Sequence, residues 1–368
     1  MGRFGTISFN IYCNFTNYGS ALQTWALLTI IKRLGHSSVL VDYCPDILAD
    51  KDPLNPFPNM WDQDEESRKN CELTMPAIRE NFIKFDRFYH EVCPITKNKY
   101  TSANFNQVIE QEKIDGFICG SDTIFCIDEF KGFDDGYFAN YACMKKRSVS
   151  YAASFGDAHF DETTYPILNE RLQNFKAVGI RENSMLQYVT SHTNVPCQRT
   201  IDPTLLLKAN DYDALSSARQ VKEPYLLFYT RRYDTAMEAY AEKVAKEKGL
   251  KIVEISLRAT NADKGHIMRY DAGVEEFLSL MKYADFVVTN SFHGLIFGVQ
   301  YKKPLVVFIR EQAGNKINEL LDLFGMQGSK FITGDEQYKD IDYDKVHLNI
   351  EKARKNSLDF LKMELECL

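Results

Sequence analysis

Several common signatures are missing from this sequence of 368 residues. None of its nine cysteines forms a Cys-x-x-Cys pair or clusters with histidine at zinc-site spacing. Scattered cysteines in odd number are typical of free thiols in a reducing compartment. The dinucleotide fingerprint Gly-x-Gly-x-x-Gly is also missing. We therefore expect a cytoplasmic protein without a metal site or a disulfide framework.

Positive charge is in deficit, because 44 Lys and Arg face 51 Asp and Glu, a formal net charge of −7. This balance argues against nucleic-acid binding, which needs a basic surface. Residues 4–31 carry no charge, but Asn10, Asn14 and Gln23 interrupt them. No apolar run of about 20 residues exists there, which argues against a signal peptide or a membrane span. We expect a buried strand followed by a buried helix, and membrane contact that is at most peripheral.

Hydrophobic residues make up 45% of the chain, and at about 150 residues per domain its length predicts two domains. The first half alternates strands and helices, a pattern typical of a parallel sheet covered on both faces. Its helices are expected at 20–34 and around 78–92. Its strands are expected at 5–11, 38–43, 115–119, 147–153, 176–180 and 199–201.

The second half repeats this alternation. Its strands are expected at 225–229, 251–255, 285–289 and 305–309, with helices near 235–248, 274–283, 294–301 and 316–324. We predict an α/β protein of two Rossmann-like domains facing a cleft, with a C-terminal helix. The expected boundaries are residues 1–206 for the first domain, 207–224 for a linker, 225–340 for the second domain and 341–368 for a helical tail.

Ligands in such folds bind at the carboxyl ends of the strands. The loop at 14–20 leads into a helix, and Asn17 and Gly19 allow its backbone N–H groups to face a ligand. A simple helix cap by Asn17 or Ser20 explains the same residues. Gln23, one turn further, is expected to face the cleft.

Two further strand ends in the first half carry hydroxyl and carboxylate groups. Ser121 and Asp122 follow the strand at 115–119, where serine donates and aspartate accepts or acts as a base toward vicinal hydroxyls. A local turn or cap is the alternative. Ser154 ends the strand at 147–153 and lies at the same rim.

Arg181 stands between a strand and a helix, where a guanidinium and a helix N-terminus together hold a carboxylate or phosphate. The alternative is a surface ion pair between Arg181 and Glu182.

The run from Asn290 through Ser291 and His293 to Gly294 is the strongest single candidate. His293 falls in the first turn of an apolar helix, where its imidazole can donate to an oxyanion or act as a general acid. A purely structural histidine is the alternative.

Three arginines follow strands of the second half. Arg231, Arg232 and Arg258 are candidates for a diphosphate contact, and a solvated basic edge explains them equally well.

Taken together, these segments resemble the polysaccharide pyruvyl transferase family. Six of them occur in the family's order: NYGSALQ at 17–23, DGFICGSD at 115–122, SYAASFG at 150–156, IRE at 180–182, IDPTLL at 201–206 and SFHG at 291–294.

The resemblance implies a fold like that of GT-B glycosyltransferases, with the acceptor on the first domain and the donor on the second. It implies transfer of a pyruvyl group from phosphoenolpyruvate to two sugar hydroxyls as a cyclic ketal, without a further cofactor. The acceptor would belong to a capsule or exopolysaccharide precursor, such as a lipid-linked oligosaccharide at the inner membrane face.

By motif, the family's phosphoenolpyruvate contacts fall on Arg181 and His293. Many members carry arginine two residues before that histidine, where this chain has Ser291. Another cation is therefore expected to replace it.

We assign His293 as acid or phosphate ligand, Arg181 as anion clamp and Asp122 as hydroxyl acceptor or base. Two other functions fit the same residues. One is a sugar-nucleotide glycosyltransferase with Arg231 and Arg232 on the diphosphate, and the other is a carbohydrate-binding relative without catalysis.

Overall fold

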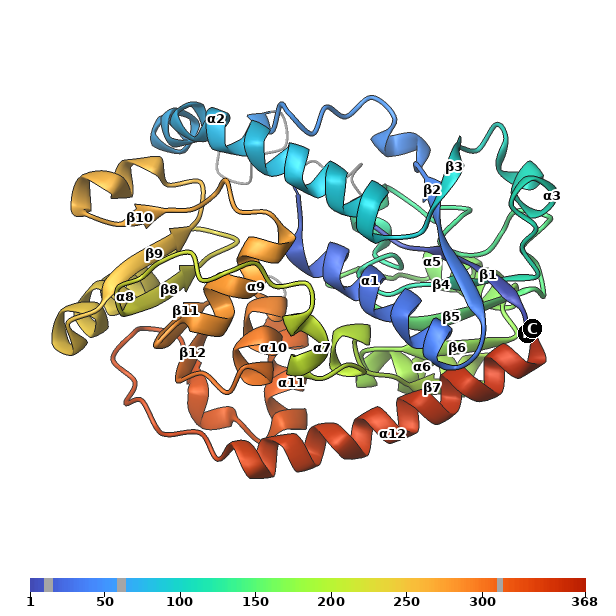
Figure 1. Ribbon diagram of the computed structural model, residues 1–368. Helices are drawn as coiled ribbons and strands as arrows, with labels where there is room; N and C mark the ends of the chain where they lie inside the picture. Colours follow the sequence, from blue (N-terminus) through green and yellow to red (C-terminus); the bar gives the residue numbers. More distant parts are fainter. Residues whose placement is uncertain (10–15, 58–63, 310–313) are drawn as a thin grey trace.

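Two parallel β-sheets form the frame of the protein in a computed structural model that describes residues 1–9, 16–57, 64–309 and 314–368 (Figure 1). Within these residues, the first sheet has the order β3-β2-β1-β4-β5-β6-β7. Its strands are β1 (Arg3–Ile7), β2 (Ser37–Tyr43), β3 (Ile95–Tyr100), β4 (Gly116–Cys119), β5 (Ser148–Ala153), β6 (Ala177–Ile180) and β7 (Cys197–Arg199).

The second sheet has the order β10-β9-β8-β11-β12-β13 over the same described residues. Its strands are β8 (Tyr225–Tyr229), β9 (Lys251–Ile255), β10 (Ile267–Met268), β11 (Phe286–Thr289), β12 (Leu305–Phe308) and β13 (Lys330–Phe331). Every strand pair in both sheets is parallel. The predicted fold class, two Rossmann-like units in an α/β protein, is confirmed.

The helices alternate with the strands as expected. Those of the first half are α1 (Tyr18–Arg33), α2 (Glu65–Arg87), α3 (Val108–Glu112), α4 (Ile127–Phe130), α5 (Thr164–Leu172) and α6 (Asn183–His192). Those that follow are α7 (Ala209–Asp213), α8 (Thr235–Lys248), α9 (Val274–Tyr283), α10 (Phe292–Gln300), α11 (Gly314–Phe324) and α12 (Tyr343–Cys367).

Some boundaries differ from the expectations. The strand expected at 199–201 lies two residues earlier, and the segment expected to be a plain linker contains α7. Strands β3, β10 and β13 were not expected; β3 is largely polar, and the other two have two residues each. Of the strand expected at 5–11 and the loop expected at 14–20, residues 10, 11, 14 and 15 lie outside the described part.

Helix α1 lies between the two halves and is buried on most of its surface, in agreement with its uncharged sequence. Tyr18 stacks on Phe277 of α9 with ring centroids 4.4 Å apart, and its hydroxyl donates to the carbonyl of Ala272 at 2.7 Å. One hydrophobic cluster runs from the first sheet through α1 into the second sheet. The strand ends that carry the predicted site therefore face each other across a packed interface.

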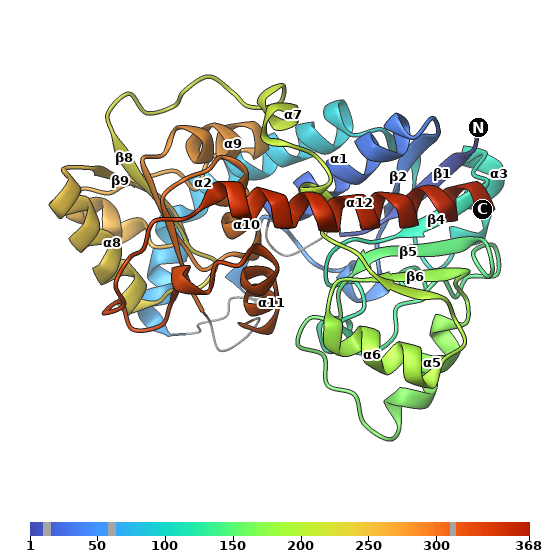
Figure 2. The same cartoon turned by 90° about the horizontal axis from the view of Figure 1, so that it is seen from below.

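Helix α12 crosses from the second half to the first (Figure 2). It packs on α11 near its beginning. Further along, Arg354 donates to the carbonyls of Leu205 at 2.7 Å and Leu207 at 3.1 Å, and the Ser357 hydroxyl accepts from the Ile201 amide at 3.1 Å. The C-terminal helix is thus part of the first half's structure.

Candidate active site

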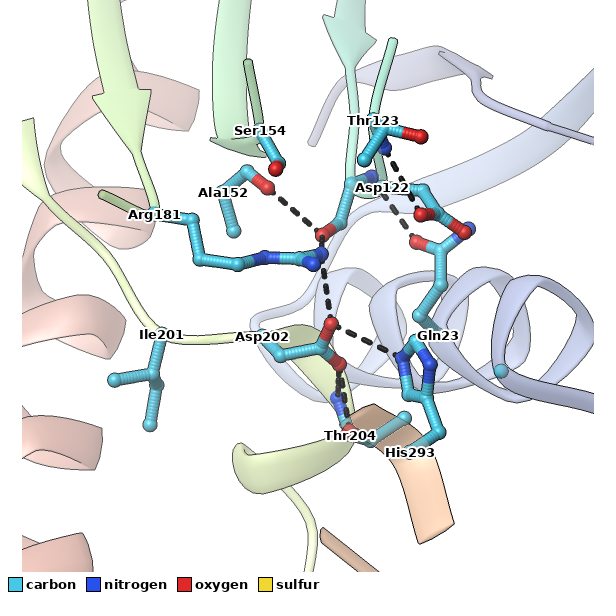
Figure 3. Close-up of polar contacts among 12 residues, drawn as sticks. Gln23, Asp122, Thr123, Ala152, Ser154, Arg181, Ile201, Asp202, Thr204 and His293 are labelled. Atoms are coloured by element: carbon cyan, nitrogen blue, oxygen red, sulfur yellow. Dashed lines mark hydrogen bonds and ion pairs between the residues drawn. The ribbon is translucent and has the colours of Figure 1, made fainter. Parts of the chain in front are cut away.

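Polar side chains from both halves meet where the carboxyl ends of the sheets face one another. Ser121 and Asp122 follow β4, and Arg181 follows β6. His293 lies in the first turn of α10 in the second half. The structure thus brings the three predicted catalytic side chains, Asp122, Arg181 and His293, to one region (Figure 3).

Asp202 joins Arg181 to His293. Its Oδ2 lies 2.8 Å from Nη2 of Arg181 and 3.3 Å from Nε2 of His293. Its Oδ1 accepts from the backbone N–H of Thr204 at 2.9 Å and from the Thr204 hydroxyl at 2.6 Å (Figure 3). The Asp202 carboxylate therefore fixes one cation and the imidazole with one oxygen, while the other oxygen holds it in place.

The pKa of Asp202 reflects this position. Burial raises it, but the neighbouring charges of Arg181 and His293 outweigh burial and hold it well below its usual range. The side chain is fully buried, and an uncompensated charge there would be costly. Asp202 was not among the predicted site residues, although it lies in the IDPT segment.

Ser121 supports the same guanidinium from the other side. Its hydroxyl accepts from Nη2 of Arg181 and donates to the carbonyl of Ala152 at 2.8 Å. Its backbone N–H donates to Oε1 of Gln23 at 3.0 Å, and the Gln23 amide donates to the Ser8 hydroxyl at 2.8 Å. The expectation that Gln23 faces the cleft is wrong, because its side chain is fully buried and holds the turn after β4.

Asp122 adopts a φ of +81°, a left-handed conformation that is uncommon outside glycine. Its Oδ2 accepts from the Ser20 hydroxyl at 2.6 Å, and its Oδ1 accepts from the Thr123 amide at 2.9 Å. Each oxygen keeps one lone-pair site for a further donor. Its carboxylate therefore retains the capacity to accept a ligand hydroxyl.

Arg181 does not form the surface pair with Glu182 that was the alternative interpretation. Its guanidinium pairs with Asp202 instead and lies 4.9 Å from the ring centroid of Phe292. Glu182 turns to Ser154, whose hydroxyl donates to Oε1. Because Ser154 is fully buried, the predicted ligand contact by its hydroxyl is not available in this arrangement.

The N-terminus of α1 packs directly on His293. Asn17 caps the helix by accepting from the amides of Gly19 at 3.0 Å and Ser20 at 3.4 Å, so the capping interpretation holds. A Cβ at Gly19 would overlap Nδ1 of His293. Glycine is therefore required at position 19 for the imidazole to approach the helix.

The side chains of Asn290 and Ser291, just before His293, hydrogen-bond to backbone groups. Ser291 caps α10, since its hydroxyl accepts from the Gly294 amide at 3.2 Å. Asn290 is fully buried; its Oδ1 accepts from the Arg231 amide at 2.9 Å and its Nδ2 donates to the Arg232 carbonyl at 2.8 Å. Direct ligand contact by the Asn290 side chain, as predicted, is therefore not available either.

Of the three candidate arginines, Arg231 lies at this site. Its Nη1 donates to the carbonyl of Thr16 at 3.4 Å, beside Asn17, and its charge interacts with Asp122. Arg258 lies elsewhere, because it pairs with Glu66 of α2 at 2.7 Å and stacks on Tyr233. The prediction that Arg258 contacts the ligand is therefore not supported by its position.

The arrangement suits a small anion that reacts by proton transfer. Arg181 is linked to His293 through Asp202, Arg231 lies beside the N-terminal end of α1, and the N-terminus of α10 adds its own positive end. The described residues contain no group of three His, Cys, Asp or Glu side chains arranged for a metal ion.

The sequence profile of a family described as polysaccharide pyruvyl transferase matches residues 17–312. This segment contains every predicted site residue. No protein of curated function matches the chain in a sequence comparison.

Solved structures resemble the whole chain at low sequence identity. The S. aureus MnaA–UDP co-structure has a TM-score of 0.51 and 13% identity, covering 100% of this chain and 98% of that one. The UDP-GlcNAc 2-epimerase from Methanocaldococcus jannaschii has a TM-score of 0.49 at 11% identity, with 95% and 92% covered. The glycosyltransferase SnogD from Streptomyces nogalater has a TM-score of 0.47 at 11% identity, with 100% and 99% covered. The likeness to the S. aureus structure shows the GT-B type of fold and nothing about the ligand.

Proposed function

Because the chain belongs to the polysaccharide pyruvyl transferase family, we propose that it moves a pyruvyl group from phosphoenolpyruvate onto two hydroxyls of a sugar. The product is a cyclic ketal in a surface-polysaccharide precursor, and inorganic phosphate is released. The observation that carries the proposal is the Asp202 carboxylate, which holds Arg181 and His293 together across the two halves.

The donor carries two anionic groups, and the site offers two cations. Arg181 is held by Asp202 and Ser121, so it presents a fixed charge to a carboxylate or phosphate. Arg231 takes the place of the arginine that Ser291 replaces, since it reaches the N-terminus of α1 next to His293. Electrostatic stabilisation of this kind costs little reorganisation because the groups are already in place.

Proton transfer falls to His293. Its imidazole donates a proton to C3 of phosphoenolpyruvate, which makes C2 electrophilic, and the first sugar hydroxyl then bonds to C2. The second hydroxyl replaces phosphate at C2 and closes the ketal ring. Asp202 stabilises the charged imidazole and orients it, and Asp122 accepts the proton of an incoming hydroxyl.

The proposal includes no cofactor beyond the donor. The acceptor is a sugar of a polysaccharide precursor, and a lipid-linked oligosaccharide is the form we propose. No helix in the described part of the chain has the length and apolarity to cross a membrane. We therefore propose that a lipid-linked acceptor is met by peripheral contact at the cytoplasmic side.

Phosphate release and the ketal methyl signal in NMR, with phosphoenolpyruvate and a panel of galactosides and mannosides, test the proposal. We expect turnover by the native protein and loss of at least about 100-fold in Arg181→Ala and His293→Ala, because each removes a group that acts on the donor. Arg33→Ala, which removes an exposed pair with Asp211, is the control and should retain activity.

Thermal-shift measurements separate this function from sugar-nucleotide transfer. Phosphoenolpyruvate should raise the melting temperature of the native protein and have less effect on Arg181→Ala. Stabilisation by UDP- or GDP-sugars alone would contradict the proposal. Binding of phosphoenolpyruvate without turnover on any acceptor would instead favour a binding protein.

A further inference from the structure

Helix α2 lies between two strands of the first sheet in sequence, but its inner face bonds to the second half. Near its beginning, the Asn70 side chain accepts from the amide of Thr260 at 3.0 Å. Near its end, Lys84 pairs with Glu276 of α9 at 2.8 Å. Figure 1 shows α2 lying across both halves. The helix therefore bridges the halves, and its buried side chains can act on groups of both.

Asn81 is the residue of this face that contacts the start of α1. Its side chain is 1% exposed. Its Nδ2 donates to the carbonyl of Ala272 in the second half and, at 3.4 Å, to the Tyr18 hydroxyl, and its Oδ1 accepts from the Thr16 hydroxyl. A carbonyl oxygen only accepts, so the amide nitrogen must face Ala272 and the amide oxygen faces Thr16. One buried side chain thus joins α2, the start of α1 and the segment before α9.

The two partners of Asn81 at the start of α1 are neighbours of Arg231. The Thr16 carbonyl accepts from Nη1 of Arg231 at 3.4 Å, and the charge of Arg231 interacts with Tyr18. In the part of the chain that the structure describes, this carbonyl is the one hydrogen-bond acceptor of the guanidinium. The hydroxyl and the carbonyl belong to the same residue, so a bond that fixes the hydroxyl of Thr16 also restricts its carbonyl. The position of Arg231 therefore depends on Asn81.

His293 is less dependent on this bond. Gly19, three residues after Thr16, lies against Nδ1 of His293. The cap by Asn17 and the hydrogen bonds within α1 hold this glycine independently of α2. A displacement of Thr16 should therefore move Arg231 more than His293, and binding of an anion should suffer more than proton transfer.

We propose that Asn81 is a positioning residue for the donor. It fixes Thr16 and thereby holds Arg231 where the guanidinium meets an anionic group of phosphoenolpyruvate, without touching the donor itself. The inference rests on the proposed function, in which Arg231 is one of two cations for the donor, and it adds helix α2 to the elements that build the site.

Asn81→Ala and Thr16→Val break the same hydrogen bond from its two ends. Each should raise the Kd for phosphoenolpyruvate, measured by calorimetry, about fivefold and leave kcat within about twofold of the native value. Asn81→Ala also leaves the buried Ala272 carbonyl without its amide donor and should lower the melting temperature. Thr16→Val, at a half-buried position, should lower it less. Thr16→Ser, which restores the hydroxyl, should recover the affinity that Thr16→Val loses.

Thr74→Val is the matched control on the same face of α2. Thr74 is buried, and its hydroxyl donates to the carbonyls of Asn70 at 2.8 Å and Leu257, in the second half, at 3.4 Å. The variant therefore weakens a buried contact between α2 and the second half without altering Thr16. It should lower the melting temperature and leave the Kd for phosphoenolpyruvate unchanged.

A double-mutant cycle separates positioning from a purely structural role. In the Arg231→Ala background, Asn81→Ala should change the Kd by less than about twofold, because the group that it positions is gone. Independent effects of about fivefold and tenfold would multiply to about fiftyfold. Multiplying effects would overturn the inference and leave the proposed function standing. So would a native Kd in Asn81→Ala and Thr16→Val. If the native protein neither binds phosphoenolpyruvate nor forms a ketal, the proposed function fails and the inference fails with it.

Discussion

Side chains at the strand ends of the first half hydrogen-bond to one another, whereas those at the strand ends of the second half hydrogen-bond mainly to backbone groups of that half. In the first half, Ser121 links Arg181 to the carbonyl of Ala152 and to Gln23. In the second half, Asn290 fixes the backbone of the loop after β8. Among the residues that the structure describes, the Arg231 side chain donates to one carbonyl, that of Thr16, at 3.4 Å. The first half therefore holds its polar side chains in fixed positions before a ligand binds. The second half contributes Arg231, which has few hydrogen bonds to described residues that a ligand would have to replace.

The largest effect is expected where the two halves meet. Asp202→Asn removes the charge that compensates Arg181 inside the protein, and losing one partner of a buried pair costs about 3–5 kcal/mol. Turnover should fall by about 100-fold or more because His293 loses its orienting carboxylate. Urea unfolding and phosphate release measure the two effects. Asp211→Asn, at a more exposed pair with Arg33, should cost less than about 1 kcal/mol. Equal losses of stability in Asp202→Asn and Asp211→Asn would contradict the distinction between the buried and the more exposed ion pair.

A smaller effect is expected from moving the imidazole. Gly19→Ala places a methyl group against Nδ1 of His293, so the ring must shift away from α1. A misplaced catalytic group commonly costs on the order of 10- to 100-fold, and kcat should fall by that amount. Gly328→Ala provides the control, since the nearest atom to a Cβ there is Cδ of Lys339 at 3.6 Å, an ordinary van der Waals contact. Full activity of Gly19→Ala would show that His293 does not act in this position.

Arg231→Ala tests the less constrained cation. The KM for phosphoenolpyruvate should rise about tenfold, because one charge-assisted contact is lost. Stability should change less than in Arg181→Ala, because loss of Arg181 leaves the buried Asp202 carboxylate without its arginine partner. Steady-state kinetics and urea midpoints of the two variants measure the contrast. If Arg231→Ala unfolds as readily as Arg181→Ala, the comparison between the halves is wrong.

The last comparison concerns stability alone. In the first half, burial raises the pKa of Asp134 to about 6. In the unfolded protein this carboxyl loses its proton at a lower pH than in the folded protein. The free energy of unfolding therefore falls as pH rises from about 4 to 6, by about 3 kcal/mol in all. In the second half, burial raises the pKa of Glu238, but Lys264 and Asn261 outweigh it and lower the pKa. Glu238 therefore adds stability above its unfolded pKa and loses it as pH falls.

Urea midpoints between pH 3 and 7 separate these opposite contributions. Asp134→Asn should remove the decline between pH 4 and 6, and Glu238→Gln should remove the gain that develops as pH rises toward the unfolded pKa of about 4.5. An unchanged pH dependence in Asp134→Asn would show that this carboxyl is ionised in the folded protein throughout the range.

Sequence patterns predicted most of the fold because each buried strand is a short apolar run. The expected strands at 225–229 and 251–255 coincide with β8 and β9. Strand β3 was not predictable because four of the six residues in its sequence, ITKNKY, are polar, as suits an edge strand. Strands of two residues, such as β13, leave no periodicity to recognise.

The candidate site was predictable only in outline. Strand ends indicated Arg181 and His293, but a sequence cannot tell a ligand-facing side chain from one that holds a turn, as with Gln23 and Asn290. Asp202 looks like an ordinary cap, because it bonds to Thr204 two residues away. Its other partners lie 21 and 91 residues along the chain. Only the folded arrangement reveals that it connects them.

Helix α12 has a consequence for how the protein is made. It covers the side of the first half near β6 and β7, where Phe360 lies close to Gly179 and Ser357 bonds to Ile201. A ribosome releases the whole first sheet long before it releases this helix. During synthesis the apolar surface under α12 stays uncovered until the second half has emerged, so chaperone contact or aggregation at that stage would fall on this surface.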